Sequence, residues 1–346
     1  MQEASHVVTV TFSPDGTRLA TGSADGKLRV FAVASDRLSS QPESAESGEP
    51  ADPAALRKLI ALRMEFQHGE EVRQVMFSPE GQLLAAISTD GGISLTRLDS
   101  KAPRRTWSAG AAGLGLAFSP DGKRLATANG SFAFVWDVAT GRELFRATHA
   151  ASADDAESPM LWIDGVALSP DGNSLATAAR DGTARVWNLT TRQELIRLTH
   201  AAPVEAVAFS KDGTTLTTGS FDGTARLWEL PSGRERLRAT HPGGSEVVAF
   251  SPDGGQVASG GTEGSVNIWS LGRSDQLAAI THPDIVSAVS LSPAATERQH
   301  SMTAAAFASG EPTGGSSAAS PHLRAEAFSS VRMVAILRVL RATHSS

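Results

Sequence analysis

A stretch about 41 residues long recurs along the chain and restricts the folds open to it. The clearest copy runs from His200 to His241: HAAPVEAVAFSKDGTTLTTGSFDGTARLWELPSGRERLRATH. It contains four short runs in which apolar and polar residues alternate, separated by Asp-Gly or Gly turns. Alternation with period two, broken by such turns, is typical of β-hairpins. Each copy therefore predicts a four-stranded antiparallel sheet.

The copies follow one another in phase. Phe-Ser-Pro or Leu-Ser-Pro ends the first run of six copies, and Lys211 replaces the proline in the clearest one; the landmarks are Pro14, Pro79, Pro120, Pro170, Lys211, Pro252 and Pro293. A sheet of this kind is apolar on both faces, so it needs a neighbour on each side. Seven copies therefore predict a closed ring of seven sheets.

These residues also carry a resemblance to a known family. The segment from His200 through Asp222-Gly223 to Trp228 resembles a WD40 repeat, as do DGTARVW at 181–187 and GSVNIW at 264–269. The recurring motifs FSPDG and LATGS resemble those of the highly self-similar bacterial members of that family. The resemblance covers about residues 6–293 and implies an all-β fold, a seven-bladed WD40-type β-propeller with a degenerate or incomplete seventh blade.

Residues 1–293 are expected to form blades one to six and the start of blade seven. Within them, residues 34–56 are rich in Ser, Pro and Glu with few apolar residues, which predicts a disordered loop. Residues 294–346 lose the Asp-Gly turn and the tryptophan, and two interpretations stay open: a degenerate remainder of blade seven, or an unstructured tail. If the ring closes, its ends share no strand, so we expect weak closure between blades seven and one.

The resemblance further implies a buried hydrogen-bonded set in each regular repeat. In that set Asp accepts from His, His accepts from Ser or Thr, and the hydroxyl accepts from the Trp indole. The matching residues are His200, Thr218, Asp222 and Trp228; His149, Thr177, Asp181 and Trp187; and His241, Ser259, Glu263 and Trp269. The first repeat has Phe31 in the tryptophan's place, and the second has Ala86 and Leu95 in the places of hydroxyl and tryptophan, so both sets are expected to be incomplete.

The histidines are expected to be structural. Seven of the nine open or close repeats, so they lie in different sheets and cannot converge on one metal ion. No metal or cofactor is predicted. Seven arginines lie on predicted outer strands, where charge discourages edge-to-edge pairing; a phosphate or nucleic-acid patch is the alternative. They are Arg142, Arg146, Arg192, Arg197, Arg234, Arg236 and Arg238.

Composition points to a soluble, non-catalytic protein. The net charge of −6 provides no global attraction for nucleic acid or an anionic membrane, and there is no cysteine. We find no Gly-x-Ser-x-Gly, P-loop or HExxH motif, and no apolar run of eighteen residues. We therefore expect a cytoplasmic monomer that is not an enzyme and binds neither nucleic acid nor membrane.

Partners of this family usually dock on the top face of the ring. The candidate residues either precede the Asp of the second turn or lie early in a first strand. They are Phe221, Arg180, Thr262, Arg73, Asp164, Glu205 and Glu246. Aromatic and Arg side chains are common interface anchors, which favours Phe221 and Arg180. The first hypothesis is a scaffold for protein or peptide partners. The alternative is the C-terminal sensor half of a larger bacterial signalling enzyme, such as a kinase, protease or NTPase.

Overall fold

The computed structural model describes residues 6–33, 60–100, 103–149, 161–251, 254–271, 276–281, 286–291, 301–309 and 331–340. Their regular elements are strands, arranged in six four-stranded sheets and one three-stranded sheet. Pairing is antiparallel and follows chain order within each sheet. The predicted loop at 34–56 lies outside the described residues.

The strands of the first three sheets match the first three repeats. The first sheet comprises β1 (Val7–Phe12), β2 (Arg18–Ser23), β3 (Lys27–Val33) and β4 (Ile60–Gln67). The second comprises β5 (Val72–Phe77), β6 (Leu83–Ser88), β7 (Gly92–Arg97) and β8 (Arg105–Ser108). The third comprises β9 (Gly113–Phe118), β10 (Arg124–Asn129), β11 (Phe132–Asp137) and β12 (Glu143–Thr148).

The remaining sheets continue in the same order. The fourth comprises β13 (Ile163–Leu168), β14 (Ser174–Ala179), β15 (Thr183–Asn188) and β16 (Glu194–Thr199). The fifth comprises β17 (Val204–Phe209), β18 (Thr215–Ser220), β19 (Thr224–Glu229) and β20 (Arg234–Thr240). The sixth comprises β21 (Ser245–Phe250), β22 (Gln256–Gly261), β23 (Ser265–Ser270) and β24 (Gln276–Thr281).

The seventh sheet has three strands among the described residues. They are β25 (Val286–Leu291), β26 (Ser301–Ser309) and β27 (Val331–Leu340). Residues 301–309 and 331–340, part of the segment for which a degenerate blade and an unstructured tail were both considered, are thus paired strands. The expected remainder of blade seven beyond residue 340 lies outside the described residues.

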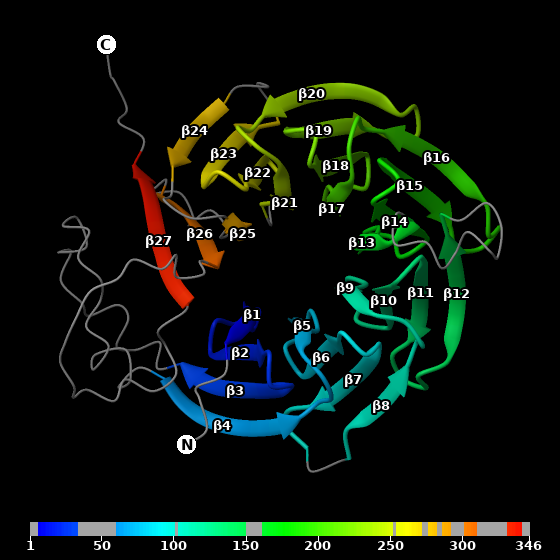
Figure 1. Ribbon diagram of the computed structural model, residues 1–346, viewed down its shortest axis with the longest axis vertical. Helices are drawn as coiled ribbons and strands as arrows, with labels where there is room; N and C mark the ends of the chain where they lie inside the picture. The colour runs from blue at the N-terminus through cyan, green and yellow to red at the C-terminus, as the bar shows by residue number, and fades with distance from the viewer. Residues whose placement is uncertain are drawn as a thin grey trace, which may run out of the picture.

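The sheets stand around a central opening like the blades of a propeller (Figure 1). The first strand of each sheet is innermost, and successive first strands pack against one another from β1 to β25. The expected all-β, WD40-type propeller architecture is confirmed.

The core lies between the sheets rather than within any one of them. One cluster joins Val186 of the fourth sheet to Leu216 and Trp228 of the fifth, all buried. Because each sheet covers its neighbour's apolar face, a single repeat has no complete core of its own.

The Asp-Gly turns between first and second strands also connect neighbouring sheets. In the fifth sheet Ser210 Oγ donates to Asp212 Oδ1 at 2.6 Å, and the same oxygen accepts from the Thr214 N–H at 3.0 Å. Gly213 provides the left-handed backbone that the turn needs, with φ of 71°. An ideal Cβ at Gly213 would lie 3.5 Å from Pro170 Cδ, so the proline of one turn rests on the glycine of the next.

Candidate functional site

The fifth sheet brings together the four residues of its predicted hydrogen-bonded set. His200 Nδ1 lies 3.0 Å from Asp222 Oδ2, and His200 Nε2 lies 2.7 Å from Thr218 Oγ1. The Trp228 indole N–H donates to the same hydroxyl at 2.8 Å. A neutral imidazole with its proton on Nδ1 satisfies all three bonds, because it donates to Asp222 and accepts from Thr218.

The fourth sheet repeats this geometry. His149 Nδ1 lies 3.0 Å from Asp181 Oδ2, its Nε2 lies 2.8 Å from Thr177 Oγ1, and the Trp187 N–H donates to Thr177 at 3.0 Å. The acidic segment 150–159 follows His149 in the sequence and lies outside the described residues. The histidine therefore keeps its place despite the longer connection to its partners.

Each of these two sets contains an arginine that the sequence reasoning did not select. Arg226 Nη2 donates to Asp222 Oδ2 at 2.6 Å, and its Nε donates to Thr224 Oγ1 at 2.9 Å. Arg185 is buried and binds Asp181 at 2.8 Å in the same way. The sequence could have indicated both arginines, because Asp-Gly-Thr-Ala-Arg occurs at 181–185 and again at 222–226. Each aspartate therefore joins a histidine to an arginine whose side chain is at most 11% exposed.

Burial and these charges shift the acidities of the sets. Burial lowers the pKa of His200, and the nearby Arg226 charge lowers it further. Burial alone would raise the pKa of Asp222, but hydrogen bonds from Thr224 and the Ala201 N–H outweigh it and hold that pKa at about 2. The His200 imidazole is thus neutral and the Asp222 carboxylate is ionised at neutral pH.

The sixth sheet corrects one prediction. His241 Nε2 lies 2.5 Å from Ser259 Oγ as predicted, but its Nδ1 bonds to Ser265 Oγ at 2.8 Å instead of to Glu263. The Glu263 side chain is one methylene longer than Asp, and the residue is exposed. Within the described residues no hydrogen bond joins the Trp269 indole to Ser259. Of the three predicted bonds, this set therefore keeps only the one between His241 and Ser259.

A second correction concerns the tryptophan position of the second repeat. Leu84 lies opposite Thr96 in the β6–β7 pairing, just as Leu216 lies opposite Trp228 in the β18–β19 pairing. Thr96 therefore takes the tryptophan's place, and the assignment of Leu95 was wrong. The spacing agrees with this register, because Thr96 follows Asp90 by six residues just as Trp228 follows Asp222.

The first three sheets hold incomplete sets. In the second sheet Ala86 lacks a hydroxyl, and both ring nitrogens of His68 have no partner among the described residues; the Thr96 hydroxyl is also unpaired there. The third sheet keeps only the bond from the Trp136 indole to Thr127, at 3.0 Å. The His149, His200 and His241 side chains of the fourth, fifth and sixth sheets are buried, so these sets hold the sheets together rather than face a ligand.

The top face is the side of the ring that carries the β14–β15 and β18–β19 turns. There Arg180 makes a two-pronged ion pair with Asp164, with both N–O distances at 3.0 Å. Its guanidinium carbon lies 5.1 Å from the Trp162 ring centroid. The Asp164 side chain is 9% exposed and burial raises its pKa, whereas the Arg180 side chain is 36% exposed. Asp164 and Trp162 thus hold the Arg180 guanidinium in one orientation, and part of its surface stays open to solvent.

Trp162 was not predicted, because it precedes its strand at a position outside the repeated pattern. The fifth repeat has Pro203 there, and the backbone role is the same in both. The Arg180 N–H donates to the Trp162 carbonyl at 2.9 Å, and the Phe221 N–H donates to the Pro203 carbonyl at 2.9 Å. Arg180 and Phe221 therefore occupy equivalent turn positions in adjacent sheets.

Phe221 is exposed at this turn, with 44% of its surface accessible. An ideal Cβ at Gly244 would lie 2.5 Å from Phe221 Cδ1, so the ring rests directly on that backbone. Thr262, the equivalent residue of the sixth sheet, instead accepts a hydrogen bond from the Gly244 N–H at 2.9 Å. Phe221 is an aromatic ring that is both exposed and fixed, whereas the Thr262 hydroxyl is used internally.

The other candidates lie at the inner end of the first strands. Arg73 pairs with Glu71 at 3.1 Å, and its charge lowers the pKa of Asp164. Glu205 raises the pKa of Arg180, so it also lies close enough to the Arg180–Asp164 pair to act on it. The Glu246 side chain lies outside what the structure describes.

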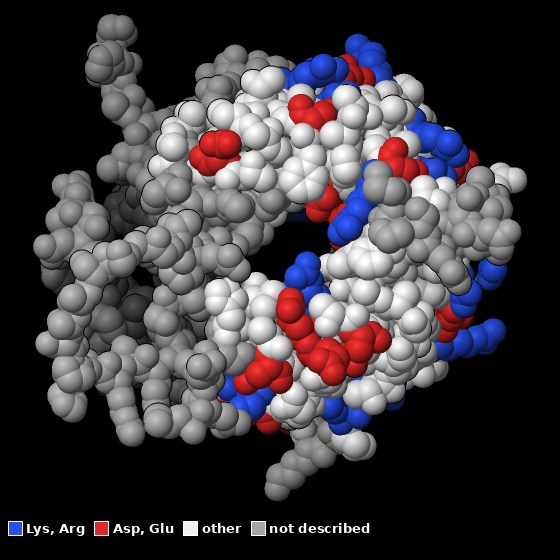
Figure 2. All heavy atoms as spheres, in the orientation of Figure 1, with Lys and Arg blue, Asp and Glu red and all other residues white. Residues whose placement is uncertain are grey.

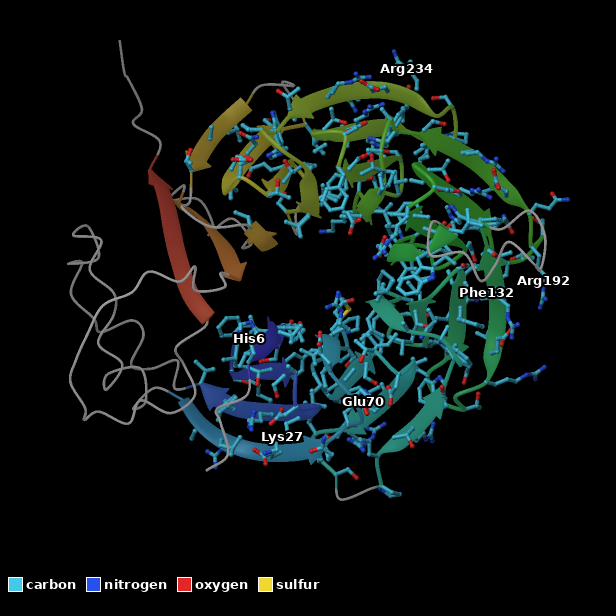
Figure 3. The ribbon with its side chains drawn as sticks, viewed as in Figure 1. His6, Lys27, Glu70, Phe132, Arg192 and Arg234 are labelled. Atoms are coloured by element: carbon cyan, nitrogen blue, oxygen red, sulfur yellow. The ribbon has the colours of Figure 1, made fainter. Side chains whose placement is uncertain are left out.

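Opposite charges gather on different parts of the ring. Acidic side chains lie together over β5 and β7 on the face shown in Figure 2, where Figure 3 labels Glu70. Basic side chains gather along the outer edge of β12, β16 and β20, and the labelled Arg192 and Arg234 project there away from the ring.

Many of the outer-edge arginines are paired locally. Arg146, Arg197 and Arg238 each bind a glutamate three residues earlier, at 2.9 Å or less. These exposed pairs fit the predicted role of edge charges, since such pairs contribute little stability but oppose strand addition.

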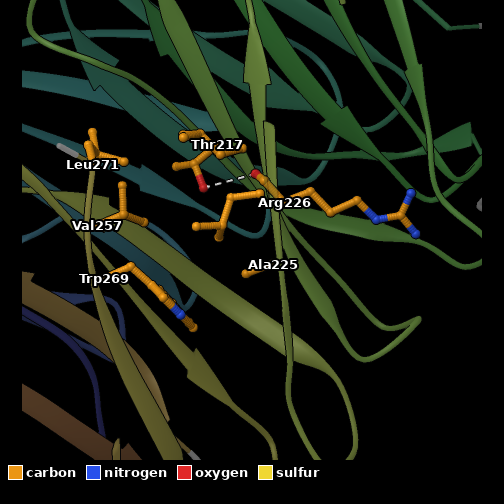
Figure 4. Close-up of a pocket in the computed structure, with 8 residues that line it drawn as sticks. Thr217, Ala225, Arg226, Val257, Trp269 and Leu271 are labelled. Atoms are coloured by element: carbon orange, nitrogen blue, oxygen red, sulfur yellow. Dashed lines mark hydrogen bonds between the residues drawn. The ribbon is translucent and has the colours of Figure 1, made fainter. Parts of the chain in front are cut away.

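An apolar recess lies between the fifth and sixth sheets (Figure 4). It is lined by Thr217, Ala225, Arg226, Leu227, Leu237, Val257, Trp269 and Leu271. Val257 lies opposite Trp269, at the position where the fifth sheet has the larger Leu216 opposite Trp228. The recess therefore marks an incompletely filled boundary between sheets, and it offers a ligand no pair of convergent polar groups.

Other site classes were considered within the described ranges. No group of three or more His, Asp or Glu residues there is placed to hold a metal ion. No helix among them has the length and hydropathy needed to cross a lipid bilayer.

Comparison with known proteins finds a family model that matches the chain at four places. The family model described as "WD domain, G-beta repeat" matches residues 2–31, 160–188, 192–229 and 238–270. The chain carries WD40 repeats. All four matches include the turn between the second and third strands of a sheet with its Asp or Glu, at Asp25, Asp181, Asp222 and Glu263.

Several curated relatives share part of this sequence. Protein HIR1 of Yarrowia lipolytica is 29% identical over 57% of this chain and 16% of its own length. The chromatin assembly factor 1 subunit FAS2 homolog of rice is 26% identical over 54% of this chain and 34% of its own. The WD repeat-containing protein VIP3 of Arabidopsis thaliana is 29% identical over 43% and 49%. The chain thus spans less than half of each, and these eukaryotic relatives give no support to a bacterial affinity.

Proposed function

We propose that this WD40 propeller is a non-catalytic platform that binds protein or peptide partners on its top face. The observation that carries the proposal is the pair of fixed, partly exposed anchors at one turn position in adjacent sheets. Arg180 is held by Asp164 and Trp162, and Phe221 is held by the backbone of Gly244. Aromatic and Arg side chains fixed before binding lose little conformational freedom on docking, so they suit an interface.

The relatives support the class of this proposal. One is named as a subunit of chromatin assembly factor 1 and another as a WD repeat-containing protein, and none of the three is named as an enzyme. Partner identity, cellular location and a monomeric state remain part of the proposal.

The test compares two exposed apolar residues of similar accessibility. Phe221 on the top face is 44% exposed, and Leu195 on the outer strand β16 is 51% exposed. Phe221→Ala should leave the free energy of unfolding within about 0.5 kcal/mol of wild type, as surface substitutions usually do. In quantitative affinity capture it should lose partners that Leu195→Ala retains. Identical partner sets for wild type and both variants would reject the top-face proposal.

A second candidate is that this propeller is the interaction part of a larger protein. The matched region makes up only 16% of HIR1 and 34% of the chromatin assembly factor subunit, which favours this arrangement. The specific version with a kinase, protease or NTPase gains no support from those names. Mass measurement of the protein from its source cells tests the candidate, since a mass of 36.0 kDa would count against it.

A further inference from the structure

The Arg180 guanidinium is fixed on two of its sides. Its Nε and Nη2 atoms donate to the Asp164 carboxylate, and its carbon lies over the Trp162 ring, 5.1 Å from the centroid. Asp164 is itself held in place by burial, since its side chain is only 9% exposed. The Arg180 side chain is nevertheless 36% exposed. Its open part is therefore the planar face that looks away from Trp162.

The charges around Arg180 are already offset by carboxylates. The hydrogen bonds to Asp164 raise the pKa of Arg180, and the nearby charge of Glu205 raises it further. Arg73 of the second sheet acts on Asp164 as well, but it has its own ion pair with Glu71 at 3.1 Å. Two arginines thus share these surroundings with three carboxylates. A carboxylate of a partner would meet an excess of negative charge there, which disfavours it.

The open guanidinium face is suited to a planar apolar group instead. Guanidinium groups stack on aromatic rings, as Arg180 already does on Trp162 from one side. A second ring on the open side would complete a sandwich, and Arg180 would keep its hydrogen bonds to Asp164 while the ring is bound. No buried polar group is then left unpaired, so the cost of removing water from this face is small.

We propose that the docking surface formed by Arg180, Trp162 and Asp164 recognises an aromatic side chain of the partner, which stacks on the open face of the Arg180 guanidinium. This inference rests on the proposed top-face function and narrows it to one kind of partner residue. Recognition needs the planar guanidinium, so a positive charge of another shape in its place does not suffice.

The outer edge of the ring holds a similar arrangement that serves as a control. Arg146 donates to Glu143 through the same two nitrogens, and its guanidinium carbon lies 4.9 Å from the Phe134 ring centroid. The side chains of this pair are 52% and 35% exposed, whereas Asp164 is 9% exposed. Because exposed ion pairs contribute little free energy, Arg146 is not fixed in the way that Arg180 is.

Three tripeptides with blocked ends test the proposal: Gly-Tyr-Gly, Gly-Leu-Gly and Gly-Glu-Gly. The chain contains no tyrosine, so the tyrosine ring signals belong to the probe alone. Dissociation constants are measured by NMR titration for the wild type, Arg180→Lys and Arg146→Lys. We expect the tyrosine peptide to bind the wild type more tightly than the other two peptides do. Its binding should weaken about fivefold in Arg180→Lys and stay unchanged in Arg146→Lys.

Equal or tighter binding of the leucine or glutamate peptide would overturn the proposal. Equal binding of the tyrosine peptide by the wild type and Arg180→Lys would also overturn it, as would equal weakening in the two variants. A measurement on the wild type covers the case in which Arg180→Lys does not fold. The Arg180 Nε–H signal should move upfield when the tyrosine peptide is added, because a stacked ring shields it, and a signal that stays in place would reject the stacking.

Failure of this inference can be told apart from failure of the proposed function. If Phe221→Ala loses partners in affinity capture while the tyrosine peptide does not bind, the top-face platform stands and the choice of an aromatic partner residue is wrong.

Discussion

Replacing Trp228 with Phe measures what the hydrogen-bonded set contributes to stability. The indole N–H donates to Thr218 at 2.8 Å, and the tryptophan is 6% exposed. The substitution keeps an aromatic ring but removes the donor and leaves some empty volume. A net hydrogen bond is worth about 1 kcal/mol, and the empty volume adds a further cost.

The sixth sheet offers a matched control that separates these two costs. Trp269 has the same register position and is also 6% exposed, but its indole makes no hydrogen bond to Ser259 among the described contacts. Trp269→Phe should therefore show the volume cost alone. In urea unfolding we expect Trp228→Phe to lose about 1 kcal/mol more than Trp269→Phe.

A double-mutant cycle assigns that difference to one contact. In a Thr218→Val background the hydroxyl that accepts from the indole is gone, so the extra cost of Trp228→Phe should disappear. Equal losses for Trp228→Phe and Trp269→Phe in the otherwise unchanged chain would refute the argument that the bond stabilises the sheet.

Two further predictions rest on ionisation and on backbone conformation. Burial lowers the pKa of His241 to about 4, below its ordinary value near 6.5, so the folded state binds this proton less readily than the unfolded chain. The stability that neutral His241 provides is complete above pH 6.5 and is lost as the pH falls from about 6.5 to 4. The loss is as much as about 3 kcal/mol, since each pKa unit corresponds to about 1.4 kcal/mol. Urea midpoints measured against pH should fall in this window, and they should fall less in a His241→Gln variant. Arg192 has a φ of 61°, where the equivalent Gly141 and Gly233 have 74° and 71°. Arg192→Gly should raise the stability by up to about 1 kcal/mol through relief of left-handed strain, and a drop in the urea midpoint would show that the bond from Arg192 to the Leu144 carbonyl matters more.

The sequence predicted features that depend on local period and turn chemistry. Alternating runs and Asp-Gly turns specify a hairpin within a few residues, so the strands near His200–His241 follow directly from them. The positions of Thr218 and Trp228 could be derived because the repeats are in phase. Arg226 could have been added from the same comparison, since its position is also repeated in the fourth sheet.

Other features depend on atoms that a repeat alignment does not describe. Glu263 aligns with aspartates, yet its extra methylene carries the carboxylate outward and Ser265 takes its partner. Trp162 stands outside the repeated positions, so its contact with Arg180 follows only from the folded chain.

Self-similar repeats separate the residues that build the ring from those that distinguish its parts. The buried His-Thr-Asp-Trp sets recur nearly unchanged in the fourth and fifth sheets, so they offer a partner no means of telling one sheet from another. One position earlier in the same turn, the side chain changes from Arg180 to Phe221 to Thr262, while the backbone bonds of the first two are the same. A partner that binds one side of this ring in preference to another therefore has to recognise such variable turn positions, and the fixed sets beneath them hold those positions rigid.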